Sequence, residues 1–252
     1  MNGEQNAGIA TELSRRKEEW RRMIAHDLRS PLSNILAVLQ VINEIPKDRG
    51  FNDNEKELIE ISLRSGRRMT ELLDLFLDIA KLDEGVMPVN KRTIPILPIV
   101  RTTIEEQSIV AKSKRVSISV SCAETTTAWT DPELLGRVIQ NLLNNSLKFT
   151  PDSGHIMIEV KNLPQNTISI SVKDTGSGIS PEGLSSLFDR FYQAQARREG
   201  RIQGNGLGLT FCREAIRTLG GDIRVQSEPG TGSEFTVTLP QTASIPDKVN
   251  AF

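Results

Sequence analysis

The sequence around His26 contains the residue types of a nucleophile and its helpers. An ideal helix turns by about 100° per residue, so with Ile24 at 0° His26 lies near 200° and Ser30 near 240°. Imidazole titrates near neutral pH, and a carboxylate such as that of Asp27 can bond one ring nitrogen and leave the other free to attack. We expect these side chains and the helix bend at Pro31 to meet on the solvent side, although a lone exposed histidine is more often an ordinary surface residue.

Two glycine-rich segments, 174–178 (DTGSG) and 204–208 (GNGLG), are candidate phosphate-binding turns. The first follows a predicted strand, and the second precedes a predicted helix. Glycine lets backbone N–H groups approach phosphate closely, and a helix start adds a positive dipole end. Each segment alone is weak evidence for a phosphate-binding site, because glycine is common in turns of every kind. Neither is a P-loop or a dinucleotide fingerprint, and the signatures of eukaryotic protein kinases are absent.

Asn141, Asn145 and Lys148 recur at spacings of four and three residues, so they share one face of a predicted helix. Amide oxygens suit a hard cation such as Mg²⁺, and a lysine ammonium neutralises phosphate. The face is therefore a candidate site for a metal ion and phosphate oxygens. On these residues alone, a polar helix face with an asparagine-rich end explains the pattern as well.

The composition indicates a folded protein and excludes several classes of function. The chain has 252 residues, enough for about two domains, and 37% of them are hydrophobic. A net charge of −1 argues against wholesale disorder and against a polyelectrolyte role with nucleic acid. Cys122 and Cys212 are too few and too far apart for a disulfide scaffold or a thiolate zinc site. No apolar run reaches the roughly 18 residues of a membrane span, so we expect a soluble protein or the cytoplasmic part of a larger one.

Residues from about 10 to 82 read as two long helices joined by a short polar break that contains Pro46. Apolar residues recur every three or four positions on both sides of the break, which predicts an antiparallel helical hairpin. A lone hairpin leaves its apolar stripe half covered, so pairing with a second copy as a four-helix bundle is the economical solution. A simple coiled-coil spacer explains the periodicity equally well.

From about Pro88 the pattern changes to alternating helices and strands. A helix is predicted to begin at Pro132, with Asp131 as its N-cap. Strands are predicted over 116–120, 155–160, 167–172 and 234–239. This order predicts an α/β sandwich with one helical layer on a mixed sheet, followed by a disordered tail over 241–252.

Five motifs occur in the order found in bacterial sensor histidine kinases of two-component signalling, and the chain resembles that family over about residues 15–240. They are the phosphoacceptor box 26–32 (HDLRSPL), the asparagine box 141–149 (NLLNNSLKF), the first glycine box 174–178, the phenylalanine box 187–191 (LFDRF) and the second glycine box 204–208. Each motif alone is moderate evidence for the family, and five motifs in the same order make coincidence implausible.

The resemblance implies a multidomain architecture. Residues 1–14 would be a linker, residues 15–87 a dimerisation and phosphotransfer hairpin in a dimeric four-helix bundle, and residues 88–240 a catalytic ATP-binding domain of the type shared with gyrase and heat-shock chaperones. ATP and Mg²⁺ would be the cofactors. The partners would be a second copy and a response-regulator receiver domain, in the cytoplasm, without nucleic acid and without a membrane segment in this chain.

The resemblance also assigns roles to the motif residues by position. His26 would take the γ-phosphoryl group, and Asp27 would orient or deprotonate its ring. Asn145, with Asn141, would hold Mg²⁺. The other ATP-binding residues would be Lys148 at the phosphates, Phe149 against the base, Asp174 at the adenine amino group, Arg190, the glycines Gly176, Gly178, Gly204, Gly206 and Gly208, and a lid at 193–203.

Two positions depart from the family's pattern. The residue four positions after the phosphoacceptor is commonly Thr or Asn in members that also dephosphorylate their partner. Here it is Ser30, whose hydroxyl can still orient water, so phosphatase activity stays open. Many members carry Arg after the Tyr that follows the phenylalanine box, where this chain has Gln193. Arg190, Arg197 or Arg198 can substitute for that γ-phosphate contact.

Two other functions are weighed against the kinase. An ATPase or chaperone could use the same nucleotide fold, but those relatives place a Glu general base at the position of Asn141, and an amide cannot accept that proton. The hairpin with His26 would also have no role there. A catalytically dead dimerisation scaffold is disfavoured by intact Asn145, Asp174 and glycine boxes.

Overall fold

The structure is a computed structural model, and it describes residue 25 and residues 27–42, 51–184, 187–188 and 207–243. It has two compact units, a helical hairpin and an α/β unit that begins near Ile79. Several predicted features lie outside the described residues: His26, Arg190, Gly204, Gly206, the lid at 193–203 and residues 244–252 of the tail.

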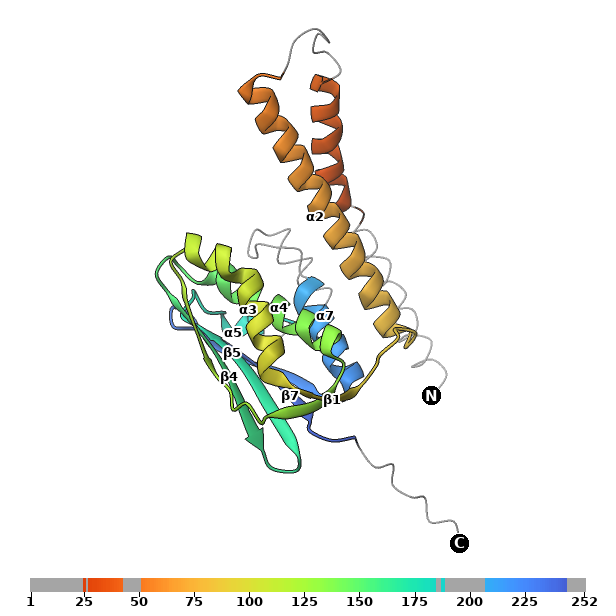
Figure 1. The fold of residues 1–252 in the computed structure, drawn as a ribbon. Coiled ribbons are helices and arrows are strands. Elements are labelled where there is room, and N and C mark those ends of the chain that lie inside the picture. The colour runs from red at the N-terminus through yellow and green to blue at the C-terminus, as the bar shows by residue number, and fades with distance from the viewer. Residues whose placement is uncertain (1–24, 26, 43–50, 185–186, 189–206, 244–252) are drawn as a thin grey trace, which may run out of the picture. The chain divides into compact units, whose positions relative to one another are not determined.

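The hairpin consists of a first helix, residues 27–42, and α2 (Asp53–Asp83) (Figure 1). α2 begins with a capping box, in which Glu55 N donates to Asn52 Oδ1 at 2.9 Å and Asn52 N donates to Glu55 Oε2 at 2.8 Å. Where the helices meet, Ile35 faces Gly66, and a Cβ added to that glycine would lie 3.7 Å from Ile35 Cδ1. The predicted pair of long helices is confirmed.

The first helix continues through Pro31, and the side it buries differs from our expectation. Asp27 is only 7% exposed, and Pro31 and Val38 are buried as well. These residues recur at spacings of four and seven, so they share one helical face, and that face is the covered one. The expectation that Asp27 and the bend at Pro31 lie on the solvent side is therefore wrong, whereas Ser30 is exposed as expected.

A five-stranded mixed sheet forms the base of the α/β unit, in the order β2-β4-β5-β7-β6. β2 pairs with β4 in parallel, and the other three pairings are antiparallel. The strands are β2 (Ser117–Ser121), β4 (His155–Leu163), β5 (Thr167–Asp174), β6 (Asp222–Glu228) and β7 (Gly232–Pro240). A separate two-stranded sheet pairs β1 (Arg92–Pro95) with β3 (Thr127–Thr130). The predicted mixed sheet is confirmed.

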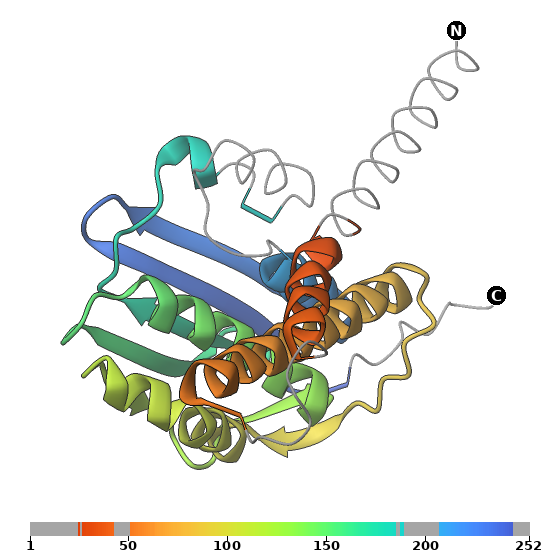
Figure 2. The ribbon, with the colours of Figure 1, turned by 90° about the horizontal axis from the view of Figure 1, so that it is seen from above.

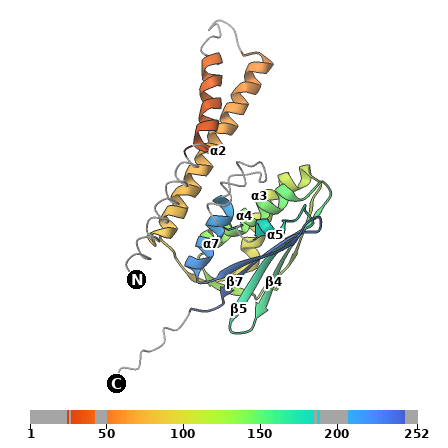
Figure 3. The same cartoon turned by 180° about the vertical axis from the view of Figure 1, so that it is seen from behind.

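Helices α3 (Ile96–Ser113), α4 (Pro132–Phe149) and α7 (Leu207–Leu219) lie on one face of the sheet (Figures 1, 2 and 3). Successive strand residues point to opposite faces, so alternate residues such as Ile168, Ile170 and Val172 of β5 are buried under the helices. Burying each such side chain contributes about 1.5–3 kcal/mol. This core holds α4, and therefore the candidate site, in place.

Strands β1, β3 and β6 are not among the predicted strands. β1 and β3 have four residues each, too few for an alternating pattern to stand out, and β1 ends at Pro95. β6 is an edge strand, and only Ile223 of its side chains is buried. No helix among the described residues is long and apolar enough to cross a membrane.

Candidate functional site

Asp131 holds the first turn of α4, as predicted. Its Oδ1 accepts from Glu133 N and Leu134 N, both at 3.0 Å, which satisfies two of the N–H groups that a helix start leaves without partners. Its Oδ2 accepts from Asn90 N at 2.7 Å, which ties the start of α4 to the segment before β1. The carboxylate thus fixes where the helix begins and, through the helical period, where its polar face points.

The polar face of α4 carries Asn141 and Asn145, which are half-buried, and Lys148, which is exposed. The rest of the helix packs into the core with seven buried apolar side chains: Leu134, Leu135, Val138, Ile139, Leu142, Leu143 and Leu147. The prediction that the three polar residues share one face of a helix is confirmed. Partial burial of the two amides places them at the border between core and solvent, where a ligand can reach them.

Asn141 joins α4 to the last residue of the second glycine box. Its Nδ2 donates to Arg137 O at 2.9 Å, one turn back in the same helix. A Cβ added at Gly208 would lie only 2.8 Å from Asn141 Oδ1, so glycine lets α7 begin close to this amide without a shift of the Asn141 side chain. The structure therefore brings together two motifs that are more than sixty residues apart in the chain.

Asp174 ends β5 with a buried carboxylate that is only 4% exposed. Oδ1 accepts from Gly176 N at 2.9 Å and from Ser233 N at 3.2 Å, and Oδ2 accepts from Ser146 Oγ at 3.2 Å. An ionised carboxylate has about four lone-pair positions, so these bonds leave capacity for one more donor. The side chain is set up to accept a hydrogen bond from a ligand.

Burial raises the pKa of Asp174 above its ordinary value, because an ionised carboxylate loses hydration in the core. The hydrogen bonds from Gly176, Ser233 and Ser146 act in the opposite direction and offset part of that rise. Ser146 and Ser233, which we did not predict, hold the carboxylate from α4 and from β7. Ser146 directly follows the motif residue Asn145, and Ser233 follows a Gly-Thr-Gly turn, but neither pattern indicates contact with Asp174.

The glycines of the first glycine box are required by close contacts. A Cβ on Gly176 would lie 2.7 Å from Asp174 Oδ1 and 2.8 Å from Phe149 O. Gly178 has a φ of +68°, and a Cβ there would overlap the carbonyl oxygen of Glu228, the last residue of β6. A side chain at either position would push the box away from α4 or from the sheet.

Phe149, the last residue of α4, is 42% exposed, which is unusual for a large aromatic side chain. Lys148 Nζ lies 5.0 Å from the centroid of its ring, a distance at which a cation is attracted to an aromatic face. The end of α4 thus presents a flat apolar surface and a positive charge side by side. A ligand with a planar ring and a charged phosphate chain matches both features.

The metal-binding chemistry available here is that of amide oxygens. Among the described residues, no three His, Cys, Asp or Glu side chains gather as a metal site. Mg²⁺ commonly takes one or two protein oxygens and completes its shell with water and substrate phosphate. The amides of Asn141 and Asn145 fit that requirement when the ligand itself supplies phosphate oxygens.

Two family models match the chain. Residues 16–85 match the His Kinase A (phospho-acceptor) domain, and residues 130–243 match the family described as histidine kinase-, DNA gyrase B- and HSP90-like ATPase. The chain therefore belongs to the histidine kinases, with a phospho-acceptor domain followed by an ATPase-type domain.

Similar proteins agree with this assignment. Sensor protein EvgS of Escherichia coli (strain K12) is 30% identical over 245 residues, which cover 94% of this chain and 20% of EvgS, so the chain spans about a fifth of that relative. The Acinetobacter baumannii histidine kinase AdeS has the same fold, with a TM-score of 0.70 at 17% identity over 86% of this chain and 98% of the solved AdeS chain. Histidine kinase ThkA, solved in complex with response regulator protein TrrA, has a TM-score of 0.64 at 18% identity over 95% of this chain and 64% of that one.

Proposed function

We propose that this chain binds ATP with Mg²⁺, phosphorylates itself on His26 and passes the phosphoryl group to an aspartate of a response regulator. The observation that carries this proposal is the convergence of α4 with the two glycine boxes, at Asp174 and at Asn141. The match of residues 16–85 to phospho-acceptor domains supports His26 as the acceptor. The complex of ThkA with a response regulator protein supports the choice of partner.

In this proposal the adenine amino group donates to the remaining lone pair of Asp174, and the ring of Phe149 lies against the base. Lys148 neutralises phosphate charge, and the backbone of Gly176 and Gly178 lines the base-binding end. Arg190, Gly204, Gly206 and Gly208 complete the ATP site, with residues 193–203 as its lid. Of this last group, Gly208 has structural support, through its contact with Asn141.

Asn145, with Asn141, holds the Mg²⁺ that accompanies the triphosphate. When bound, the metal neutralises charge that develops on the phosphate oxygens during transfer. The protein's own contribution is to fix the two amides on one face of α4, next to Lys148, so that the triphosphate is oriented before reaction.

In the transfer step an unprotonated ring nitrogen of His26 attacks the γ-phosphorus. The nitrogen–phosphorus bond forms while the bond to the oxygen bridging the β-phosphate breaks, and ADP leaves with that electron pair. Asp27, whose side chain is buried, orients the ring and accepts the proton of its other nitrogen. Such chemistry depends mainly on positioning and charge stabilisation. The exposed hydroxyl of Ser30 can orient water for a reverse phosphatase reaction.

We further propose that residues 15–87 form a homodimeric four-helix bundle, and that residues 88–240 form the catalytic domain. The single chain leaves seven large apolar side chains exposed on its two hairpin helices: Leu32, Leu36, Leu39, Val41, Leu63, Leu73 and Leu77. A second copy would cover them. Since the reaction consumes ATP, we place it in the cytoplasm.

Labelling with γ-³²P-ATP and Mg²⁺ tests the proposed kinase activity. We expect acid-labile, alkali-stable label on the wild-type chain, because a phosphoramidate hydrolyses in acid. His26→Gln should abolish the label, since an amide is not a nucleophile of this kind, while circular dichroism and AMPPNP binding remain unchanged.

His155→Gln serves as the matched control, because His155 lies in β4 with its ring nitrogens 2.9 and 3.0 Å from the hydroxyls of Ser117 and Ser119. It should keep the label. Label that survives His26→Gln would contradict the assignment of the acceptor.

A further inference from the structure

The last turn of α4 carries Lys148 and Phe149, and its carbonyl groups need partners from outside the helix. A helix leaves its last four C=O groups without intrahelical donors. Two of them are bound by backbone: Thr150 N donates to Ser146 O at 2.9 Å, and Ser177 N donates to Phe149 O at 3.4 Å. The second of these bonds joins the first glycine box to the helix end.

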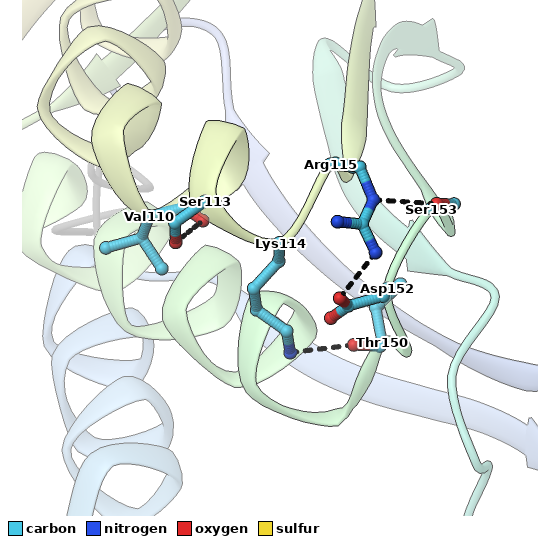
Figure 4. A network of polar contacts seen from close by, with 7 residues as sticks. All are labelled: Val110, Ser113, Lys114, Arg115, Thr150, Asp152 and Ser153. Atoms are coloured by element: carbon cyan, nitrogen blue, oxygen red, sulfur yellow. Dashed lines mark hydrogen bonds and ion pairs between the residues drawn. The ribbon is translucent and has the colours of Figure 1, made fainter.

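The other two carbonyl groups are bound by one side chain, that of Lys114. Its Nζ donates to Leu147 O at 2.5 Å and to Lys148 O at 3.4 Å. It also donates to Thr150 O at 2.8 Å, just beyond the helix (Figure 4). The ammonium group therefore completes the hydrogen bonding of the α4 terminus. A positive charge at this end is also favourable because the C-terminus of a helix carries partial negative charge.

Lys114 is held in place by the turn that follows α3. Its backbone N donates to Val110 O at 3.2 Å, and its backbone O accepts from Ser153 N at 3.0 Å. Beside it, Arg115 forms an exposed ion pair with Asp152 at 2.9 Å. The turn after α3 is thus tied to the turn after α4, and the lysine side chain extends from the first turn to the second (Figure 4).

We infer that Lys114 is a positioning residue for the nucleotide site, which rests on the proposed function. Its ammonium keeps the last turn of α4 wound, so that Lys148 and Phe149 stay where phosphate and base meet them. It also neutralises the negative helix end, which would otherwise repel a triphosphate nearby. Neither effect requires Lys114 to touch the nucleotide.

The test compares Lys114→Met with the wild-type chain. Methionine keeps most of the apolar stem and removes the ammonium. We expect the affinity for Mg–AMPPNP to fall by about fivefold to tenfold, because charged hydrogen bonds are lost at the helix end. Amide hydrogen exchange should accelerate in residues 145–150, while exchange in β4, β5 and β7 stays at the wild-type rate.

Two further variants separate positioning from general stability. Arg115→Met removes the neighbouring cation and its ion pair with Asp152 but touches no carbonyl of α4, so it should leave affinity and exchange unchanged. Lys114→Arg keeps a charged donor and should restore most of the affinity. If Lys114→Met does not fold, Lys114→Gln, a neutral donor, takes its place in both measurements.

Each outcome decides between the two proposals. If the wild type binds Mg–AMPPNP and Lys114→Met binds it equally well, the positioning role is overturned and the proposed function stands. Acceleration of exchange throughout the α/β unit would also overturn it, since the lysine would then act on stability alone. If the wild-type chain does not bind Mg–AMPPNP, the proposed function fails and the inference fails with it.

Discussion

At the scale of single residues, Asp174 shows how a site is made from a short-range motif and long-range contacts. The sequence places it after a strand and before two glycines, and the structure adds Ser146 and the backbone of Ser233 as donors. These bonds leave acceptor capacity in a buried carboxylate, and that capacity is what an adenine amino group requires.

Asp174→Asn tests this role. The carboxamide oxygen can still accept from Gly176 N and Ser233 N, and the hydroxyl of Ser146 can rotate to accept from the new NH₂ group. The new NH₂ group and the adenine amino group are both hydrogen-bond donors, so they cannot bond each other. We therefore expect Mg–AMPPNP affinity to fall by about tenfold or more. Isothermal titration measures it, and affinity within a factor of about two of the wild type would contradict the assignment.

The wild type and Asp174→Asn should also differ in how their folding stability depends on pH. Because burial raises the pKa of Asp174, the folded state binds a proton on this carboxyl at higher pH than the unfolded chain does. The contribution of Asp174 to folding stability therefore rises as pH falls from neutral through the raised pKa. This contribution becomes constant below the ordinary pKa value of 3.8. We expect the wild type to gain thermal stability relative to Asp174→Asn between about pH 7 and pH 4. A constant difference in melting temperature would argue against a raised pKa.

At the scale of elements, α4 is the part of the fold on which the site depends. Asp131 fixes its first turn, and Lys114 and the first glycine box complete its last turn. The helix is therefore held at both ends by groups from other segments, and its polar face is fixed between them.

Asp131→Ala should destabilise the α/β unit by about 1–2 kcal/mol, because a helix cap is lost and Asn90 N loses its acceptor. Calorimetry of the full chain measures it, with the transition that AMPPNP raises assigned to the nucleotide-binding unit. Asp131→Asn keeps one carbonyl oxygen as a cap and serves as the control, with a smaller loss. Equal losses in the two variants would contradict the capping role.

At the scale of the whole molecule, the hairpin leaves an apolar stripe beside the face that it buries. With Ile24 at 0°, Leu36 and Leu39 lie at about 120° and 60°, whereas buried Val38 lies at about 320°. Leu36 is 52% exposed and Leu39 is 53% exposed in the single chain. This exposure supports the proposed pairing with a second copy, because the two helices of one hairpin leave these side chains in contact with water.

Leu36→Glu combined with Leu39→Glu should weaken self-association by at least about tenfold, since two charges would enter an apolar interface. Sedimentation velocity over a range of concentrations measures it. Ser33→Glu adds charge to the exposed side of the same helix and should leave the dimer intact. A monomeric wild type, or equal dissociation by Ser33→Glu, would contradict the proposed dimer.

Many elements of this protein could be predicted from its sequence, because the sequence patterns that indicate them are local. The three- and four-residue apolar periods predicted the two hairpin helices, and alternation predicted β2, β4, β5 and β7. The Asp-Pro pair predicted the start of α4. The motif residues Asn141, Asn145 and Lys148 were assigned to one helical face from spacing alone, because the helical period is the same in every context.

Tertiary structure alone decided what depends on contacts between distant segments. The burial of Asp27, the donors around Asp174, the contact of Gly208 with Asn141 and the ammonium of Lys114 at the end of α4 each join residues through packing that no local period encodes. β6 was missed for the same reason, since an edge strand with one buried side chain exists mainly through its pairing with β7. Local propensity selects the elements of this chain, whereas the side chains that face one another are set by how the whole core packs.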